Sequence, residues 1–223
     1  MLKVGLTGGV ASGKSTLAGL LSGLGAAVCD ADLVVAELYR PGRPGALAVG
    51  ELFGHGALTP DGGVDRDALA RLVLADPEAR RKLEEVVHPL VRRAVEGWHA
   101  ALAHSSKLPA VAVVEAALLV ETGAYRDQDR LVVVTAPFEA RRAWALAAGW
   151  SASRFAQVVA AQLDDTARKA VADYVIRNDG ALEVLEQAAR DLWSLLQEDA
   201  HLLAAGKPLP ARKRKGKRVE GRG

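Results

Sequence analysis

Short apolar runs rich in β-branched residues recur along the chain and alternate with segments of helical periodicity. Such runs are typical of buried strands in a parallel sheet, and they cover residues 2–7, 26–29, 110–114, 130–135 and 173–176. Between them, apolar residues recur every three or four positions, as at Leu17, Leu20, Leu21 and Leu24, which predicts amphipathic helices. This alternation predicts an α/β fold, a three-layer parallel sheet of about five strands with right-handed crossovers.

Residues 41–105 interrupt the alternation and predict a helical insertion. Residues 41–65 are rich in Gly and Pro, which favours a loop with short helical turns. Helices are expected from Asp65 to Leu74, from Pro77 with Asp76 as N-cap, and from near His88-Pro89 to about residue 103. The remaining segments, 1–40 and 106–206, form the expected core of the fold, with further helices after Pro137 and from Leu182 to Leu203.

The net charge of +2 hides an asymmetry between the body of the chain and its end. Residues 207–223 contain eight basic residues and one acid, a balance of +7, so the first 206 residues carry −5. A mildly acidic body is not typical of a nucleic-acid-binding surface. We expect residues 207–223 to be a disordered basic tail, the one segment that could contact nucleic acid or an anionic membrane.

Other features of the chain favour a cytoplasmic protein. No apolar stretch approaches the roughly 20 residues of a membrane helix. The N-terminus lacks the apolar segment of a signal peptide, and the single cysteine, Cys29, has no partner for an internal disulfide.

Residues 8–15 read Gly-Gly-Val-Ala-Ser-Gly-Lys-Ser and match the spacing of a phosphate-binding loop. Glycines let successive N–H groups point toward a phosphate, and the following helix adds partial positive charge. We expect Lys14 to reach the β- and γ-phosphates and the Ser15 hydroxyl to bind Mg²⁺. The expected ATP-binding residues of the loop are Gly8, Gly9, Val10, Ala11, Ser12, Gly13, Lys14, Ser15 and Thr16.

The rest of the chain narrows the class of P-loop protein. No Asn-Lys-x-Asp motif is present, which argues against a GTPase, and the chain is short for a large ATPase. A small-metabolite kinase remains. Glu115 ends an apolar run, where a carboxylate could hold Mg²⁺ through water, although a solvent-facing strand end is the alternative.

Beyond the loop, the chain resembles the dephospho-coenzyme A kinase family over roughly residues 3–182. The resemblance is carried by Gly5–Ser15, Asp30-Ala31-Asp32, Pro41-Gly42, Phe53-Gly54, Asp61-Gly62, Asp65-Arg66, Leu83-Glu84, His88-Pro89-Leu90, Leu118–Glu121, Ala172–Ile176 and Asn178. It implies phosphoryl transfer from ATP to the ribose 3′-hydroxyl of dephospho-coenzyme A, giving coenzyme A.

The resemblance also implies roles for individual residues. A carboxylate that accepts the proton of a sugar hydroxyl fits Asp32, which follows a strand end, whereas Asp30 is the expected helix cap. The alternative is that both acids only cap the helix. The predicted acceptor-binding residues are Asp32, Arg66, His88, Arg92 and Glu121, and Asn178 is predicted at the nucleotide; for the two arginines a solvated helix face is the alternative.

The chain departs from the family's pattern in the lid, expected at about residues 141–160. There the family carries an Arg-x-x-x-Arg-Asp run that stabilises transferring phosphate charge. Aligned without gaps, those positions are Ala143, Ala147 and Ala148, and the chain offers Arg141, Arg142 and Arg154 nearby. We predict that Arg142 or Arg154 closes over ATP, with Arg142 as the catalytic candidate.

Two other functions stay open at this point. One is a different small-metabolite or nucleoside kinase with the same core. The other is a nucleotide-binding paralogue impaired in its lid. The four tryptophans are expected to pack in the core or the insertion rather than stack on bases.

Overall fold

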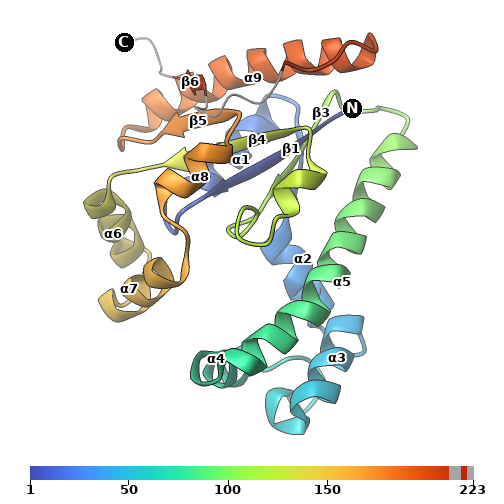
Figure 1. Cartoon of the computed structure of the whole chain (residues 1–223), viewed down its shortest axis with the longest axis vertical. Coiled ribbons are helices and arrows are strands. Elements are labelled where there is room, and N and C mark those ends of the chain that lie inside the picture. Colours follow the sequence, from blue (N-terminus) through green and yellow to red (C-terminus); the bar gives the residue numbers. More distant parts are fainter. Residues whose placement is uncertain (211–216, 220–223) are drawn as a thin grey trace. The chain divides into compact units, whose positions relative to one another are not determined.

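The computed structural model describes residues 1–210 and 217–219 of the chain (Figure 1). The chain divides into two compact units, one formed by Met1–Cys29 with Leu102–Gly223 and the other by Asp30–Ala101. Among the described residues, no helix has both the length and the apolar character needed to span a bilayer.

The first unit is built on a sheet in which all five predicted strands are found. They are β1 (Leu2–Gly8), β2 (Ala27–Asp30), β3 (Val111–Glu115), β4 (Arg130–Thr135) and β5 (Tyr174–Arg177). The strand order is β2-β3-β1-β4-β5-β6, and the pairs of β1 with β3, β1 with β4, and β4 with β5 are parallel. The prediction of a parallel α/β sheet is therefore confirmed.

The sixth strand, β6 (Lys217–Val219), comes from the segment expected to be a disordered tail. It pairs in parallel with β5, with Lys217 opposite Tyr174. The prediction was therefore wrong for these residues, because the unpaired edge of β5 offers backbone hydrogen bonds that no local sequence pattern announces. Residues 211–216 and 220–223 of the predicted tail lie outside the described part of the chain.

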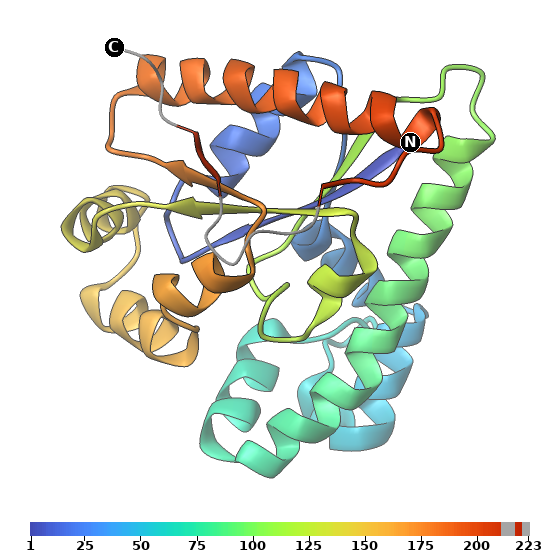
Figure 2. The same cartoon turned by 45° about the horizontal axis from the view of Figure 1, so that its top comes forward.

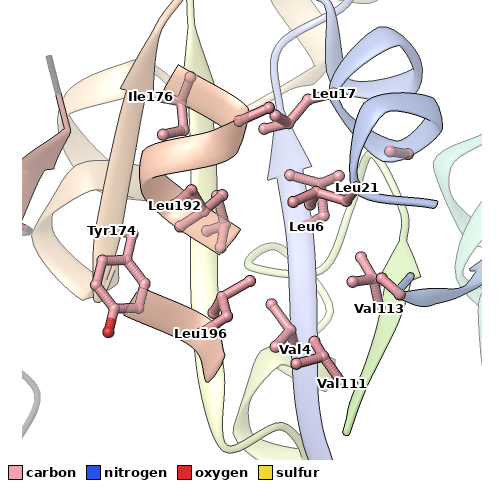
Figure 3. Close-up of a cluster of buried hydrophobic side chains, with 14 of the residues drawn as sticks. Val4, Leu6, Leu17, Leu21, Val111, Val113, Tyr174, Ile176, Leu192 and Leu196 are labelled. Carbon is pink, nitrogen blue, oxygen red and sulfur yellow. The ribbon is translucent and has the colours of Figure 1, made fainter. Parts of the chain in front are cut away.

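Helices cover both faces of the sheet, and the turn between β1 and α1 lies at the carboxyl end of the inner strand β1. On one face, α1 (Lys14–Gly23) and α9 (Leu182–Ala204) bury their leucines against the strands, as Figure 3 shows for Leu17, Leu21, Leu192 and Leu196 around Val4 and Leu6. Figure 2 shows α9 running along the sheet. On the other face, Leu131 and Val133 of β4 pack against Leu119 and Ala172.

Three further helices of this unit follow β4. They are α6 (Phe138–Ala147), α7 (Ala152–Ala161) and α8 (Asp165–Val171), and a short 3-10 helix, Ala124–Asp127, precedes β4. The helices α6 and α7 match the helix expected after Pro137 and lie in the segment where the lid is predicted. Helix α8 was not predicted, although Asp164 caps it by accepting a hydrogen bond from the N–H of Ala167 at 2.7 Å.

The second unit contains α2 (Ala31–Leu38), α3 (Pro44–Phe53), a 3-10 helix (His55–Ala57), α4 (Arg66–Ala75) and most of α5 (Pro77–Ala103). Its core gathers Ala46, Val49, Ala57, Val64 and Leu69. The prediction of a loop at residues 41–65 was wrong for α3. Pro44 begins this helix and its residues Ala46 and Val49 are buried, so tertiary packing stabilises a helix despite the local Gly and Pro content.

The predicted helix start at His88-Pro89 was also wrong, because α5 runs unbroken through Pro89. Asp76 caps this helix as expected, accepting from the N–H of Glu78 at 2.8 Å. Pro89 lies on the exposed side, while Val87 and Val95 lie on the buried side. The proline removes one backbone hydrogen bond, and burial of the apolar stripe on both sides of it maintains the helix.

Candidate functional site

The turn between β1 and α1 has the backbone of a phosphate-binding loop. Gly13 is in the left-handed region with φ 93°, and Ala11 also has a positive φ of 56°. The hydroxyl of Ser12 is buried and has no hydrogen-bond partner among the described residues. A buried hydroxyl without a partner is costly, and a phosphate oxygen of a bound nucleotide would satisfy it. The loop therefore fits the predicted ATP phosphates.

Two side chains from distant parts of the chain hold this loop in place. Gln162, at the end of α7, accepts a hydrogen bond from the N–H of Val10 at 2.9 Å. Asn178, just after β5, donates to the carbonyl oxygen of Ser12 at 3.0 Å. A Cβ on Gly13 would overlap the amide of Asn178, so glycine is required there for this close approach. The structure thus places Asn178 at the loop. It also places Gln162 there, a residue that no motif in the sequence indicated.

The hydroxyl of Ser15 and the carboxylate of Glu115 lie side by side at the carboxyl ends of β1 and β3. Ser15 donates to Oε1 of Glu115 at 2.6 Å, and Glu115 is buried. Mg²⁺ prefers oxygen ligands and usually keeps several waters, so one hydroxyl and one carboxylate are enough protein ligands beside nucleotide phosphates. No larger group of His, Cys, Asp or Glu suited to a metal is present in the described residues. The residues present therefore fit Mg²⁺.

Two guanidinium groups converge on Gly9 of the loop. A Cβ on Gly9 would overlap Nη1 of Arg141 and would lie 3.7 Å from Nη1 of Arg168. Arg168 is almost fully buried, and the Nε atoms of both arginines are buried without a hydrogen-bond partner among the described residues. Two positive groups with unused donors beside a phosphate loop are suited to bind the terminal phosphate of a nucleotide.

The predicted lid arginines have other contacts. Arg142 is exposed, and its nearest acid is Glu139 at 3.8 Å. The guanidinium carbon of Arg154 lies 4.2 Å from the centre of the Trp150 ring. Arg141, one position before Arg142, is the arginine of α6 that the structure places against the loop. A shift of one position rotates a helical side chain by about 100°, which explains the difference.

Glu121 lies next to Arg168, within the same unit as the phosphate loop. Its Oε1 accepts from Nη2 of Arg168 at 2.7 Å and from the N–H of Leu163 at 3.1 Å. Asp165 lies 3.5 Å from Nη1 of the same arginine. Glu121, predicted as an acceptor contact, therefore has a partner within the protein and orients a buried arginine. Arg168 was not predicted as a functional residue. It lies on α8, and the sequence signal for that helix is its cap residue, Asp164.

A cavity of about 410 Å³ opens beside the loop. It is lined by Ala11, Ser12, Gly13, Lys14, Ser15, Thr16, Trp144, Asn178, Gly180, Leu182 and Leu185. The loop residues contribute polar groups to this lining, and the leucines contribute apolar groups. A nucleotide has the same division between its phosphates and its base.

The remaining predicted residues lie in the second unit. Asp30 caps α2, accepting from the N–H groups of Asp32 at 2.8 Å and Leu33 at 3.3 Å, as expected. Asp32 follows the end of β2 by two residues, and its exposed side chain takes no part in this cap. Arg66 begins α4, and His88 and Arg92 lie on the exposed side of α5.

The chain is similar to known proteins over most of its length. The family model for dephospho-CoA kinase matches residues 2–183. The chain belongs to the dephospho-CoA kinase family. It is 39% identical over 206 residues to the dephospho-CoA kinase of Frankia casuarinae, covering 92% of this chain and 88% of that one. The enzyme of Aquifex aeolicus is 36% identical over 199 residues, covering 89% of this chain and 100% of that one.

Solved structures show the same fold. A crystal structure of a Thermus thermophilus protein has a TM-score of 0.74 at 33% identity, covering 87% of this chain and 97% of that one. The dephospho-CoA kinase of Campylobacter jejuni has a TM-score of 0.58 at 21% identity, with 88% and 97% covered. Membership in the dephospho-CoA kinase family confirms the predicted fold and enzyme class, an ATP-dependent kinase that converts dephospho-CoA to CoA.

Proposed function

We propose that this dephospho-CoA kinase transfers the γ-phosphoryl group of ATP to the ribose 3′-hydroxyl of dephospho-CoA with Asp32 as the base. The observation that carries the proposal is the phosphate loop with its buried, unpartnered Ser12 hydroxyl and two guanidiniums at Gly9. This arrangement supplies positive charge where a γ-phosphoryl group would transfer, and positioning with electrostatic stabilisation is most of what phosphoryl transfer requires.

Asp32 is proposed as the base because its carboxylate is available. Asp30 satisfies the N–H groups at the start of α2, so Asp32 is not needed as a cap. A ribose hydroxyl is a weak nucleophile, and a carboxylate that takes its proton in the transition state typically contributes about 10²–10⁴-fold to the rate. The proton would move from the 3′-oxygen to a carboxylate oxygen of Asp32.

Ser15 and Glu115 are the proposed Mg²⁺ residues, the serine directly and the glutamate through water. Their 2.6 Å hydrogen bond aligns the two oxygens beside Lys14, which begins α1. When bound, Mg²⁺ would neutralise charge on the β- and γ-phosphates. Lys14 would bind the same phosphates as a fixed positive charge.

Arg141 is proposed as the lid arginine, in place of the predicted Arg142 and Arg154. Its contact with Gly9 brings it to the loop, whereas neither of the others is placed there by a described contact. Arg168 is the second positive group, and Glu121 acts on it as a positioning residue through their 2.7 Å ion pair. The segment 141–160 remains the proposed lid.

The insertion is the proposed binding region for the acceptor, with Arg66, His88 and Arg92 as candidate contacts. Guanidinium groups suit the pyrophosphate of dephospho-CoA because they bind phosphate oxygens in pairs. We place the enzyme in the cytoplasm, in accord with Cys29 being the single cysteine of the sequence. No predicted site residue lies in the basic tail, so truncation after Ala205 should leave the turnover unchanged although it also removes β6 from beside β5.

A coupled assay of ADP release tests this function. Dephospho-CoA should stimulate ADP release strongly, while adenosine, shikimate and uridine at equal concentration should not. The product should carry the new phosphate on the ribose 3′-oxygen, which phosphorus NMR can assign. No stimulation by dephospho-CoA would overturn the proposal, and strong stimulation by another acceptor would indicate a different kinase.

A further inference from the structure

The lining of the cavity beside the phosphate loop includes apolar side chains, which are not suited to bind the phosphates of a nucleotide. This apolar part of the lining consists of Trp144, Gly180, Leu182 and Leu185, and Leu182 is 51% exposed. The phosphate loop, from Ser12 to Thr16, lines the rest of the cavity, and Leu185 lies next to Gly13 of the loop. A ligand that contacts both the phosphate loop and these apolar residues must combine an anionic group with an apolar one.

Trp144 reaches this cavity because of its position on α6. Arg141 and Trp144 are three residues apart, so they lie on the same side of the helix. The first contacts Gly9, and the second lies beside Gly180, where an added Cβ would be 3.5 Å from the indole carbon Cζ2. Gly180 has a φ of 117°, a conformation that favours glycine, and the indole lies within van der Waals reach of this turn.

Trp144 differs from tryptophans whose packing accounts for them. Trp193 packs against the main core cluster, and Trp150 packs with Val10, Ala145 and Phe155. Trp144 belongs to none of the hydrophobic clusters of the described residues, although it is half-buried. A large aromatic ring that lines a cavity without joining the core is suited to stack on a flat ligand.

Asn178 is a polar side chain that lines the cavity beside these apolar residues, and it makes hydrogen bonds within the protein. Asn178 donates to Ser12 and accepts from the N–H of Gly180 at 3.3 Å, so its amide is held against the loop where it lines the cavity. Trp144, Leu182 and Leu185 therefore present an aromatic ring and methyl groups to the cavity. Such a surface recognises the face of a base, and a two-ring purine gains more stacking contact than a one-ring pyrimidine.

We propose that Trp144 is the platform on which the purine base of the phosphate donor stacks. The inference rests on the proposed function for the identity of the donor, and it reverses the expectation that the tryptophans only pack. With Arg141 at the phosphates and Trp144 at the base, one face of α6 contacts both ends of the nucleotide.

Intrinsic fluorescence tests the proposal without any acceptor. Titration of the full chain with ATP should quench its fluorescence, and titration with inorganic tripolyphosphate should not. Trp144→Phe should lose most of the ATP-dependent quenching yet bind ATP within a few-fold of the wild type. The matched control Trp193→Phe should keep the quenching, because Trp193 lies outside the cavity.

Nucleotide kinetics supply the second measurement. Trp144→Ala should raise the KM for ATP roughly 5- to 100-fold, the range for loss of one base–aromatic stack, and should narrow the preference for ATP over CTP. Its affinity for tripolyphosphate should not change, which also shows that the variant is folded. An unchanged KM for ATP, or quenching that survives in Trp144→Phe, would overturn the inference.

The two proposals fail separately. If dephospho-CoA fails to stimulate ADP release while quenching by ATP still depends on Trp144, the acceptor is wrong and the base platform stands. If dephospho-CoA is phosphorylated and Trp144→Ala keeps the wild-type KM for ATP, the platform is wrong and the function stands.

Discussion

Nη1 of Arg141 occupies the space that a side chain on Gly9 would need. The two residues are brought together by α6 folding back over the phosphate loop, since they are far apart in the chain. Among the arginines of the proposed lid segment, this contact is the reason to propose Arg141 for the phosphates, and it explains why position 9 has no side chain.

Replacement of Arg141 should reduce turnover severely. We expect Arg141→Ala to lower kcat by about 10³-fold, the lower end of the range for loss of an arginine that stabilises transferring phosphate. Arg142→Ala and Arg154→Ala should each retain most of the wild-type kcat. Steady-state kinetics with dephospho-CoA would measure all three. A larger loss in Arg142→Ala than in Arg141→Ala would restore the prediction made from the sequence.

A methyl group on Gly9 should mimic the loss of Arg141. Gly9→Ala would displace the end of a flexible side chain, so we expect little change in Tm but a fall in kcat close to that of Arg141→Ala. The double variant should be no slower than either single one, because both remove the same contact. The control is Gly19→Ala, where the new Cβ meets nothing within 4 Å. Additive losses in the double variant would show that Gly9 acts by another route.

Asp32→Asn should separate chemistry from binding. Loss of the base should lower kcat about 10²–10⁴-fold, while the Kd for ATP measured by calorimetry should not change. Asp67→Asn is a matched control, because Asp67 follows the cap Asp65 of α4 just as Asp32 follows the cap Asp30 of α2. Equal kcat in the two variants would rule out Asp32 as the base.

Tyr174 should make stability decline at alkaline pH. Its buried phenol donates to Oδ2 of Asp199 at 2.6 Å, and burial, followed by this hydrogen bond, raises the pKa of Tyr174 well above 10. The unfolded chain loses the phenolic proton near pH 10 while the native state keeps it. The free energy of unfolding should therefore fall from about pH 10 upward, through the raised pKa, by up to about 1.4 kcal/mol per pH unit.

Tyr174→Phe tests this assignment. The variant should lose about 1.5–3 kcal/mol at pH 7, the usual value of a hydrogen bond to a charged group, and should show a shallower decline between pH 10 and 11. Denaturant unfolding at several pH values would measure both effects. The pKa of the half-buried Tyr39 is also raised, but Tyr39 is present in both proteins, so its effect cancels in the comparison. Parallel pH profiles would contradict the assignment.

Several features of the fold and site could be read from local patterns. The strands are short apolar runs, and the phosphate loop is a contiguous motif whose glycines and Lys14 act through nearby backbone. Asp30 as a cap depends on residues two and three positions away. Each of these depends on a few neighbouring residues, so spacing alone was sufficient to find it.

Other features depend on residues that meet only after folding. Gln162 holds Val10 from 152 positions away, and Glu121 orients Arg168 across 47. The unbroken α5 and the strand β6 depend on tertiary packing and on a free sheet edge. Spacing does not encode such contacts, because side-chain direction and burial decide them.

The sequence by itself determined the class of protein, the phosphate loop and the family to which the chain belongs. The tertiary structure decided which arginines stand at the loop and which tryptophan lines the cavity beside it. The physical reason is geometric: one residue along a helix turns a side chain by about 100°, which separates Arg141 at Gly9 from Arg142 in solvent.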